Sequence, residues 1–205
     1  IICFQEVQAD HYEQDLLPTF QSLNFNGFYT QKSRESMGQY GKVDGCAIFW
    51  NTLKFSMVES FAVEFNDLAR QEAMRHRMDE SQTRKHVNAL CKDNVAQIVI
   101  FETTTRPTSL LCVANTHLYA NFFKPEIKLW QSIVLMRQLE QIAAQRDIPM
   151  VLCGDFNSEP DSAVYEYIKR GQVSASQLDA FGDNSKILPS FDNIRHNIGF
   201  ESLMQ

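Results

Sequence analysis

An aspartate and an asparagine two residues apart follow a short apolar segment, 149–153, in the run Gly154-Asp155-Phe156-Asn157-Ser158. Side chains alternate between the two faces of a strand, so Asp155 and Asn157 are predicted to emerge together at the C-terminal end of this strand. That end is where α/β sheets commonly present ligand-binding groups. A carboxylate beside a carboxamide suits a hard cation and an attacking water. The alternative is an Asx-turn that only builds the next loop, and the pair alone leaves both interpretations open.

Two further strand ends carry residues that could join this site. His117 follows the apolar segment 109–116, and a histidine there can donate to a phosphate oxygen or to a developing oxyanion. Glu6 closes the first strand in the same way. Taken singly, His117 is more often a satisfied buried residue and Glu6 more often a surface charge. If the three strands are neighbours, these two side chains converge with Asp155 and Asn157, where magnesium would polarise a phosphoryl group.

Strand-like and helix-like segments alternate along the chain around these residues. Asp161 is predicted to cap a helix that ends at Lys169-Arg170-Gly171, and apolar positions at helical spacing predict a long helix over 125–145. The polar segment 66–92 is interpreted as a surface helix or a mobile insertion with solvated basic residues. The pattern fades into loops over 172–205. Strands are predicted at 1–5, 45–50, 55–65, 95–103, 109–116 and 149–153, which together with the helices indicates a mixed α/β layered fold.

The composition limits the classes of partner. The 19 Lys and Arg residues against 25 Asp and Glu residues give a net charge of −6, whereas a protein that grips duplex DNA non-specifically is usually basic. A polyanionic substrate would therefore be held locally, by metal ions and a few side chains. No apolar stretch approaches the ~18 residues that span a membrane. Four of the five cysteines lie in apolar strands as small buried hydrophobes, which favours a reducing compartment over disulfides.

Four segments together resemble the successive motifs of the exonuclease–endonuclease–phosphatase superfamily. They occur in the expected order and are Gln5-Glu6-Val7, Asp44-Gly45-Cys46-Ala47-Ile48-Phe49, Asn115-Thr116-His117-Leu118 and Gly154-Asp155-Phe156-Asn157-Ser158. Segments at 63–66, 92–96 and 128–131 are most similar to the carbon catabolite repressor 4 type poly(A) deadenylases. The resemblance runs from residue 1 to about 171. It implies an α/β fold with two packed mixed β-sheets flanked by helices, a four-layer sandwich.

The resemblance also implies a role for each candidate residue. Glu6 would be a ligand of magnesium (Mg2+), of which two ions are expected, and Asp155 would be the metal-linked proton acceptor and donor for the attacking water. His117 would bind the scissile phosphate, and Asn157 would contact the substrate beside it. The implied reaction is hydrolysis of poly(A) RNA from its 3′ end to 5′-AMP. The implied partners are other subunits of a deadenylase complex, in the cytoplasm and also the nucleus, with no membrane and no duplex DNA.

Phe122 stands shortly after the motif histidine, where some animal members of the family have a proline against the substrate base. An aromatic ring at this position could stack on adenine. It could equally pack under the helix that follows. Both interpretations stay open, so Phe122 is a candidate substrate-binding residue.

The chain also departs from the superfamily pattern. It opens on Ile1 in mid-strand, and the superfamily's upstream Asn and downstream Ser-Asp-His have no counterpart. We therefore expect 1–205 to be a partial catalytic domain, incomplete at both ends and inactive by itself. Two alternatives to a deadenylase stay open. One is a relative that cleaves another phosphoester, such as 2′,5′-oligoadenylate, a dinucleotide or a cyclic phosphate; the other is a catalytically dead binding module of a deadenylation complex.

Overall fold

The computed structural model describes residues 1–33, 43–189 and 193–203. Contacts divide the chain into two compact units, each built from three separate segments of sequence. The sheet unit consists of Ile1–Asn66, Lys92–His117 and Ile148–Asp155. The helical unit consists of Asp67–Cys91, Leu118–Asp147 and Phe156–Gln205. This division into contact units does not test the expectation that 1–205 is one partial catalytic domain, which stays a prediction.

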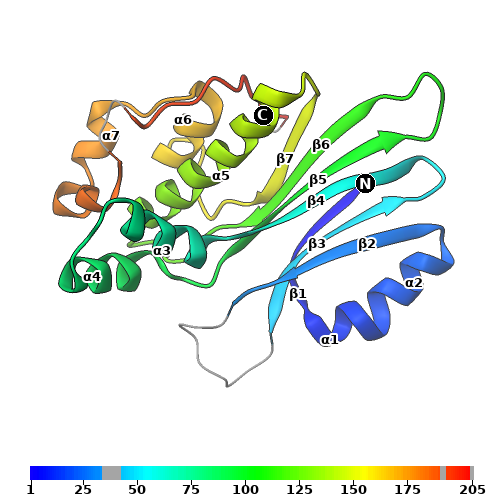
Figure 1. The fold of residues 1–205 in the computed structure, drawn as a ribbon, viewed down its shortest axis with the longest axis horizontal. Coiled ribbons are helices and arrows are strands. Elements are labelled where there is room, and N and C mark those ends of the chain that lie inside the picture. Colours follow the sequence, from blue (N-terminus) through cyan, green and yellow to red (C-terminus); the bar gives the residue numbers. More distant parts are fainter. Residues whose placement is uncertain (34–42, 190–192, 204–205) are drawn as a thin grey trace. The chain divides into compact units, whose positions relative to one another are not determined.

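The first sheet of the sheet unit has three antiparallel strands in the order β1-β3-β2 (Figure 1). A helical segment follows β1 and packs on this sheet through aromatic rings. The rings of Phe20 and Phe49 stack with their centroids 4.2 Å apart, and Tyr12 stacks on Tyr29 at 4.6 Å. The elements are β1 (Ile2–Gln8), α1 (Ala9–His11), η1 (Tyr12–Leu16), α2 (Leu17–Ser22), β2 (Phe25–Gln31) and β3 (Asp44–Asn51).

The second sheet has four strands in the order β4-β5-β6-β7. The first three are antiparallel, whereas β7 runs parallel to β6. Because parallel neighbours point the same way, the C-terminal ends of β6 and β7 lie at the same edge of the sheet. These strands are β4 (Phe55–Glu64), β5 (Val95–Thr103), β6 (Leu110–His117) and β7 (Met150–Asp155).

An apolar core and a polar network join the two sheets. Ile48 and Trp50 of β3 form one buried cluster with Val99, Phe101 and Val113 of the second sheet. The polar network centres on Asn115, which is fully buried. Its side chain accepts a hydrogen bond from Gln5 Nε2 at 2.7 Å and donates to the carbonyl oxygens of Phe4 at 3.0 Å and Ala47 at 3.2 Å. A satisfied network of this kind permits one register between the sheets, because any shift would leave buried polar atoms unpaired.

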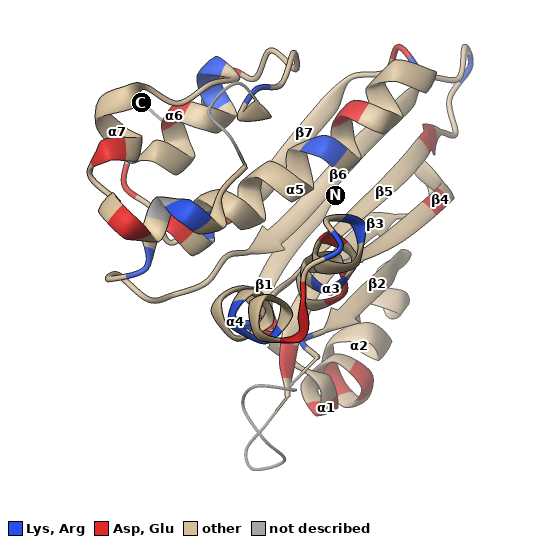
Figure 2. Cartoon of the chain, turned by 60° about the vertical axis from the view of Figure 1, so that its left-hand side comes forward, with Lys and Arg blue, Asp and Glu red and all other residues tan. Residues whose placement is uncertain are grey.

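The helical unit contains the predicted long helix, α5, with the bounds that the apolar spacing gave, Pro125–Gln145. The segment 66–92 is helical, as one of its two interpretations required, but it forms two helices, α3 (Phe65–Arg75) and α4 (Glu80–Leu90). The break between them has a local cause: Asp79 caps α4 through a reciprocal pair of hydrogen bonds with Gln82. Both helices carry acidic and basic residues (Figure 2), and the exposure of Arg75, Arg84 and Lys85 supports the interpretation of the basic residues as solvated.

The remaining helices are α6 (Ala163–Arg170), α7 (Ala175–Asp179) and the 3-10 helix η2 (Gly182–Ile187). The predicted cap of α6 was wrong by one residue: Ser162, not Asp161, accepts the hydrogen bond from the backbone N–H of Tyr165. Its end was right, because Gly171 has the left-handed φ of 72° that a glycine adopts without a Cβ clash. The prediction of loops over 172–205 missed α7 and η2, both too short to show a helical period.

The predicted fold class, α/β with two packed β-sheets and flanking helices, is confirmed, with two differences. The three-stranded sheet is antiparallel rather than mixed. Its strand β2 was not predicted, because Asn26 and Gly27 interrupt the apolar pattern of Phe25–Gln31. Within the described ranges, no helix is both long and apolar enough to span a membrane.

Candidate active site

His117 and Asp155 lie side by side at the shared C-terminal edge of β6 and β7. The parallel register pairs the two residues directly. His117 Nε2 lies 3.9 Å from Asp155 Oδ2, and the histidine side chain is 5% exposed whereas that of the aspartate is 52% exposed. A buried imidazole therefore lies beside a carboxylate that solvent or substrate can reach. The predicted meeting of these two strand ends is confirmed.

Glu6 joins this pair through an irregularity in β1. The pairing of β1 with β3 shifts register between Phe4 and Val7, and Glu6 has a left-handed φ of 57°. A bulge of this kind redirects a side chain out of the normal alternation, and a non-glycine residue in this conformation costs free energy that the surrounding fold must offset. The side chain is exposed while its neighbour Val7 is buried. Its charge raises the pKa of the His117 imidazole, so Glu6 lies within electrostatic range of the pair formed by His117 and Asp155.

The surroundings of His117 argue against a merely satisfied core histidine. Its backbone carbonyl accepts a hydrogen bond from Asn94 Nδ2 at 2.9 Å, which fixes the end of β6. Its Nδ1 is buried and has no hydrogen-bond partner within the described part of the chain. Burial lowers the pKa of His117 and the Lys32 cation lowers it further, against the opposing effect of Asp155, Glu6 and Asp44. The imidazole is therefore neutral at neutral pH and retains hydrogen-bonding capacity for a ligand.

Lys32 is a contributor to this site that the sequence did not reveal. It follows β2 and forms an ion pair with Asp44, at the start of β3. This pair brings a cation within electrostatic range of His117. Lys32 went unnoticed because β2 itself was not predicted. The available signal was Asp44, which opens one of the family-like motifs.

The carboxylates of Glu6 and Asp155 fit the magnesium site that the family resemblance implies. Both are exposed, and both act on the same imidazole. Magnesium binds proteins through one or two carboxylates and completes its shell with water and substrate phosphate oxygens. Among the residues that the structure describes, no three His, Cys, Asp or Glu side chains form a group able to hold a metal by themselves. A site on Glu6 and Asp155 would therefore depend on water and substrate for its other ligands.

Asn157 belongs to the helical unit, and its position has a different cause from the one predicted. Strand β7 ends at Asp155 and Asn157 has a φ of 46°, so the alternation of a strand does not extend to it. Its Nδ2 donates to the carbonyl oxygen of Leu118 at 2.9 Å, and its own carbonyl accepts from Lys128 Nζ at 2.6 Å. Lys128, on α5, is a second residue that sequence reasoning missed. The role of Asn157 toward a substrate stays a prediction.

Phe122 is 79% exposed and Phe123 is 83% exposed, with ring centroids 5.7 Å apart in an edge-on arrangement. The alternative in which Phe122 packs under the following helix is therefore wrong. An exposed ring is available to stack on a base, and that role stays a prediction.

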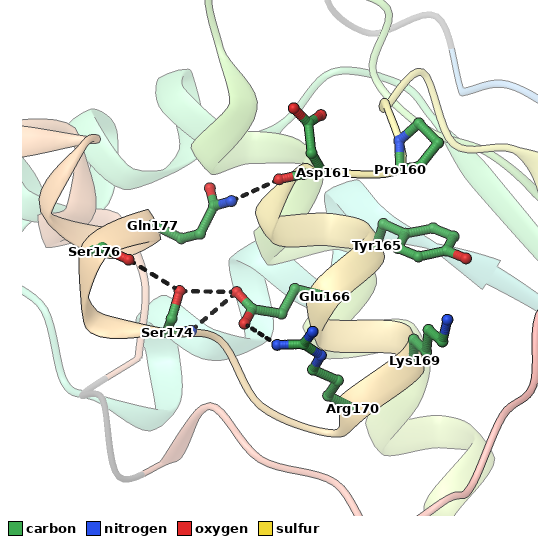
Figure 3. Close-up of a pocket in the computed structure, with 9 residues that line it drawn as sticks. All are labelled: Pro160, Asp161, Tyr165, Glu166, Lys169, Arg170, Ser174, Ser176 and Gln177. Atoms are coloured by element: carbon green, nitrogen blue, oxygen red, sulfur yellow. Dashed lines mark hydrogen bonds and ion pairs between the residues drawn. The ribbon is translucent and has the colours of Figure 1, made fainter.

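A pocket of about 560 Å3 lies elsewhere in the helical unit, along α6 and the loop that follows it (Figure 3). Its central carboxylate is already engaged: Glu166 accepts from Arg170 Nη1 at 3.2 Å and from Ser174 Oγ at 2.9 Å. The pocket contains none of the predicted site residues. The candidate active site is therefore the edge formed by Glu6, His117 and Asp155.

The chain belongs to the endonuclease/exonuclease/phosphatase family, whose model matches residues 1–199. Among curated proteins, carbon catabolite repressor protein 4 homolog 1 of Arabidopsis thaliana is 38% identical over 207 residues, which cover 97% of this chain and 34% of the relative. CCR4-NOT transcription complex subunit 6-like-B of Xenopus laevis is 35% identical over 87% of this chain and 36% of the relative. Protein angel homolog 2 of Homo sapiens is 33% identical over 87% of this chain and 29% of the relative.

The chain spans about a third of the length of these curated relatives. Its resemblance to the carbon catabolite repressor 4 type is confirmed by them. Among solved structures, ANGEL2, described as a 2′,3′-cyclic phosphatase, is similar with a TM-score of 0.66 and 34% identity over 83% of this chain and 43% of that one. The human nocturnin catalytic domain, solved with a bound sulfate anion, is similar with a TM-score of 0.63 and 25% identity. The match covers 95% of this chain and 62% of that one.

Proposed function

We propose that the protein is a magnesium-dependent 3′-exoribonuclease that hydrolyses mRNA poly(A) tails to 5′-AMP. The observation that carries this proposal is the convergence of Glu6, His117 and Asp155 at one edge of the sheet unit. Relatives named as carbon catabolite repressor 4 homologues and as a CCR4-NOT complex subunit support the choice of substrate. The complex-subunit name also supports other subunits of a deadenylase complex as partners. A location in the cytoplasm and also the nucleus stays an expectation from the family resemblance.

Each residue has a chemical task in this reaction. Asp155 accepts the proton of the attacking water and returns a proton to the 3′ oxygen that leaves. His117, neutral and buried, donates a hydrogen bond to an oxygen of the scissile phosphate. Glu6 and Asp155 hold the magnesium, which polarises the phosphoryl oxygen when bound. Asn157 contacts the substrate beside the phosphate, and Phe122 stacks on a base.

A second candidate function is hydrolysis of a 2′,3′-cyclic phosphate. The observation that favours it is the likeness to ANGEL2, a 2′,3′-cyclic phosphatase. The same edge would serve, because a cyclic phosphodiester also needs an attacking water and a hydrogen-bond donor to the phosphate. The two functions differ in product: one shortens the RNA and the other only opens a terminal ring.

The test incubates the full-length protein with 5′-labelled oligo(A) that ends in a 3′ hydroxyl, and in parallel with the same RNA ending in a 2′,3′-cyclic phosphate. The expected result is a ladder of shortened products with release of 5′-AMP, which requires magnesium and stops with a chelator. Ring opening without shortening would replace the leading function by the second. RNA binding with no turnover of either substrate would indicate a catalytically dead binding module. Glu6→Gln should abolish turnover, and the exposed Glu80→Gln in α4 is the matched control.

A further inference from the structure

Two cysteines face each other across the two sheets of the sheet unit. Cys153 of β7 pairs in register with Asn115 of β6, and residues paired across parallel strands point to the same face of a sheet. The Asn115 side chain reaches across to the backbone of Phe4 in β1. Cys153 therefore points from the second sheet toward β1.

Cys3 lies on the matching face of β1. Residues two apart on a strand share a face, and Gln5 donates a hydrogen bond from Nε2 to Asn115 Oδ1 at 2.7 Å. Cys3 itself packs against the buried cluster that joins the sheets, which includes Ile48 and Val113. The thiols of Cys3 and Cys153 lie close enough to share a hydrogen bond. Both sulfur atoms thus meet between the sheets.

We propose that Cys3 and Cys153 are a site of reversible oxidation, at which a disulfide forms between β1 and β7. None of the five cysteines is joined to another by a disulfide, and they differ in accessibility. Cys46 and Cys112 are completely buried and Cys91 is 8% exposed, whereas Cys3 and Cys153 are only partly buried. An oxidant therefore reaches this pair before the others, and the pair has its resolving thiol already in place.

The chemistry balances with hydrogen peroxide as the oxidant. One sulfur, as a thiolate, attacks a peroxide oxygen; the O–O bond breaks and a sulfenic acid and water form. The second sulfur, as a thiolate, then attacks the sulfenic sulfur, the S–O bond breaks, and a second water leaves. The two cysteines lose two electrons and two protons, and the peroxide is reduced to two molecules of water. An external dithiol reverses the change by exchange.

The position of the pair gives the disulfide a consequence for the active site. Cys3 precedes Glu6 on β1, and Cys153 precedes Asp155 on β7. A disulfide brings its sulfur atoms to about 2 Å, which is closer than two hydrogen-bonded thiols. Closing the bond therefore moves two side chains on strands that lead directly into both carboxylates. This consequence, unlike the disulfide itself, rests on the proposed function.

The test treats the reduced full-length protein with hydrogen peroxide, blocks remaining thiols with an alkylating reagent, and maps the peptides by mass spectrometry. The expected result is a linked pair of peptides carrying Cys3 and Cys153, which a dithiol separates. Cys3→Ser and Cys153→Ser should each abolish the link, whereas the control Cys91→Ser should retain it. If a serine variant fails to fold by circular dichroism, Cys3→Ala and Cys153→Ala replace it.

Recovery of both cysteines as alkylated thiols, or as separate sulfinic acids, would overturn the proposal. The mass spectrometric result does not depend on any enzymatic activity, so it tests the disulfide independently of the proposed function. Where poly(A) hydrolysis is present, peroxide should lower it several-fold in the unsubstituted protein, and a dithiol should restore it. An equal loss in Cys153→Ser would show that peroxide acts elsewhere.

Discussion

The sheet unit and the helical unit hold their candidate site residues by different means. In the sheet unit, His117 and Asp155 occupy paired positions of a parallel ladder, so the backbone register itself sets their separation. In the helical unit, Asn157 depends on two hydrogen bonds, one to the carbonyl of Leu118 and one from Lys128. A site built on strands therefore follows from sheet pairing, whereas a site on a loop needs individual side chains to secure it.

A second contrast lies in how each unit treats buried polar groups. The sheet unit joins its sheets through Asn115, whose hydrogen bonds are made with three other segments. The helical unit joins α3, α4 and α5 around Glu72, which accepts from Trp130 Nε1 at 2.8 Å and lies 3.8 Å from His86 Nε2. The first network is independent of pH and the second contains a titrating group.

The largest expected effect is on the ladder pair. Asp155→Asn keeps the shape of the side chain but removes the proton acceptor, so the turnover of oligo(A) should fall about 1,000-fold. Single-turnover kinetics with labelled oligo(A) measures it. Asp161→Asn, an exposed aspartate in the helical unit, is the matched control and should keep full activity. Activity of Asp155→Asn within tenfold of the original would refute the assigned role.

The next effect is on stability of the sheet unit. Asn115→Leu fits an apolar side chain into the core but leaves the Gln5 amide and the Ala47 carbonyl buried without this partner. The free energy of unfolding should fall by about 3 kcal/mol, measured as a lower urea midpoint. Asn26→Leu, an exposed position on β2, is the control and should change it little. Equal midpoints for the two variants would mean that the network does not hold the sheets together.

A smaller effect is expected from the exposed ring of the helical unit. Phe122→Ala removes a base-stacking surface worth about 1–3 kcal/mol, so KM for oligo(A) should rise roughly tenfold while the turnover number and the thermal midpoint stay unchanged. Phe123→Ala is the control, because its ring is equally exposed. Identical KM values for both variants would leave Phe122 without a role in binding.

The smallest effect distinguishes the two networks by pH. Burial lowers the pKa of His86 below its ordinary 6.5, against the opposing charge of Glu72. The unfolded chain therefore binds the proton more readily than the folded one, so this stability is complete above pH 6.5 and is lost as pH falls through the folded pKa. The protection factors of the amides in α3 and α4, which correct for the intrinsic slowing of exchange at lower pH, should fall over that range.

His86→Gln should flatten this pH dependence, while His11→Gln, at an exposed position of the sheet unit, should not. Exchange in the sheet unit around Asn115 serves as an internal reference. If the two His variants show the same pH profile, His86 is not the titrating group responsible.

Much of the fold could be predicted because its patterns are local. The apolar spacing of 125–145 gave α5 with its bounds, and continuous apolar runs gave β5 and β7 to within a residue or two. Strand β2 could not be predicted, since Asn26 and Gly27 are acceptable there only because the neighbouring strand β3 pairs with them. The same gap concealed Lys32, which needs β2 to place it near His117.

The candidate site divides along the same line. Residue type and spacing determined that Glu6, His117, Asp155 and Asn157 could do chemistry, and the family resemblance added Phe122. The tertiary structure decided which of them meet, because parallel pairing and a bulge are relations between strands that no single segment encodes. It also turned Cys3 and Cys153 from two ordinary strand residues into one pair. The reactivity of a side chain follows from its residue type, whereas its distance from other side chains follows from how the strands pack.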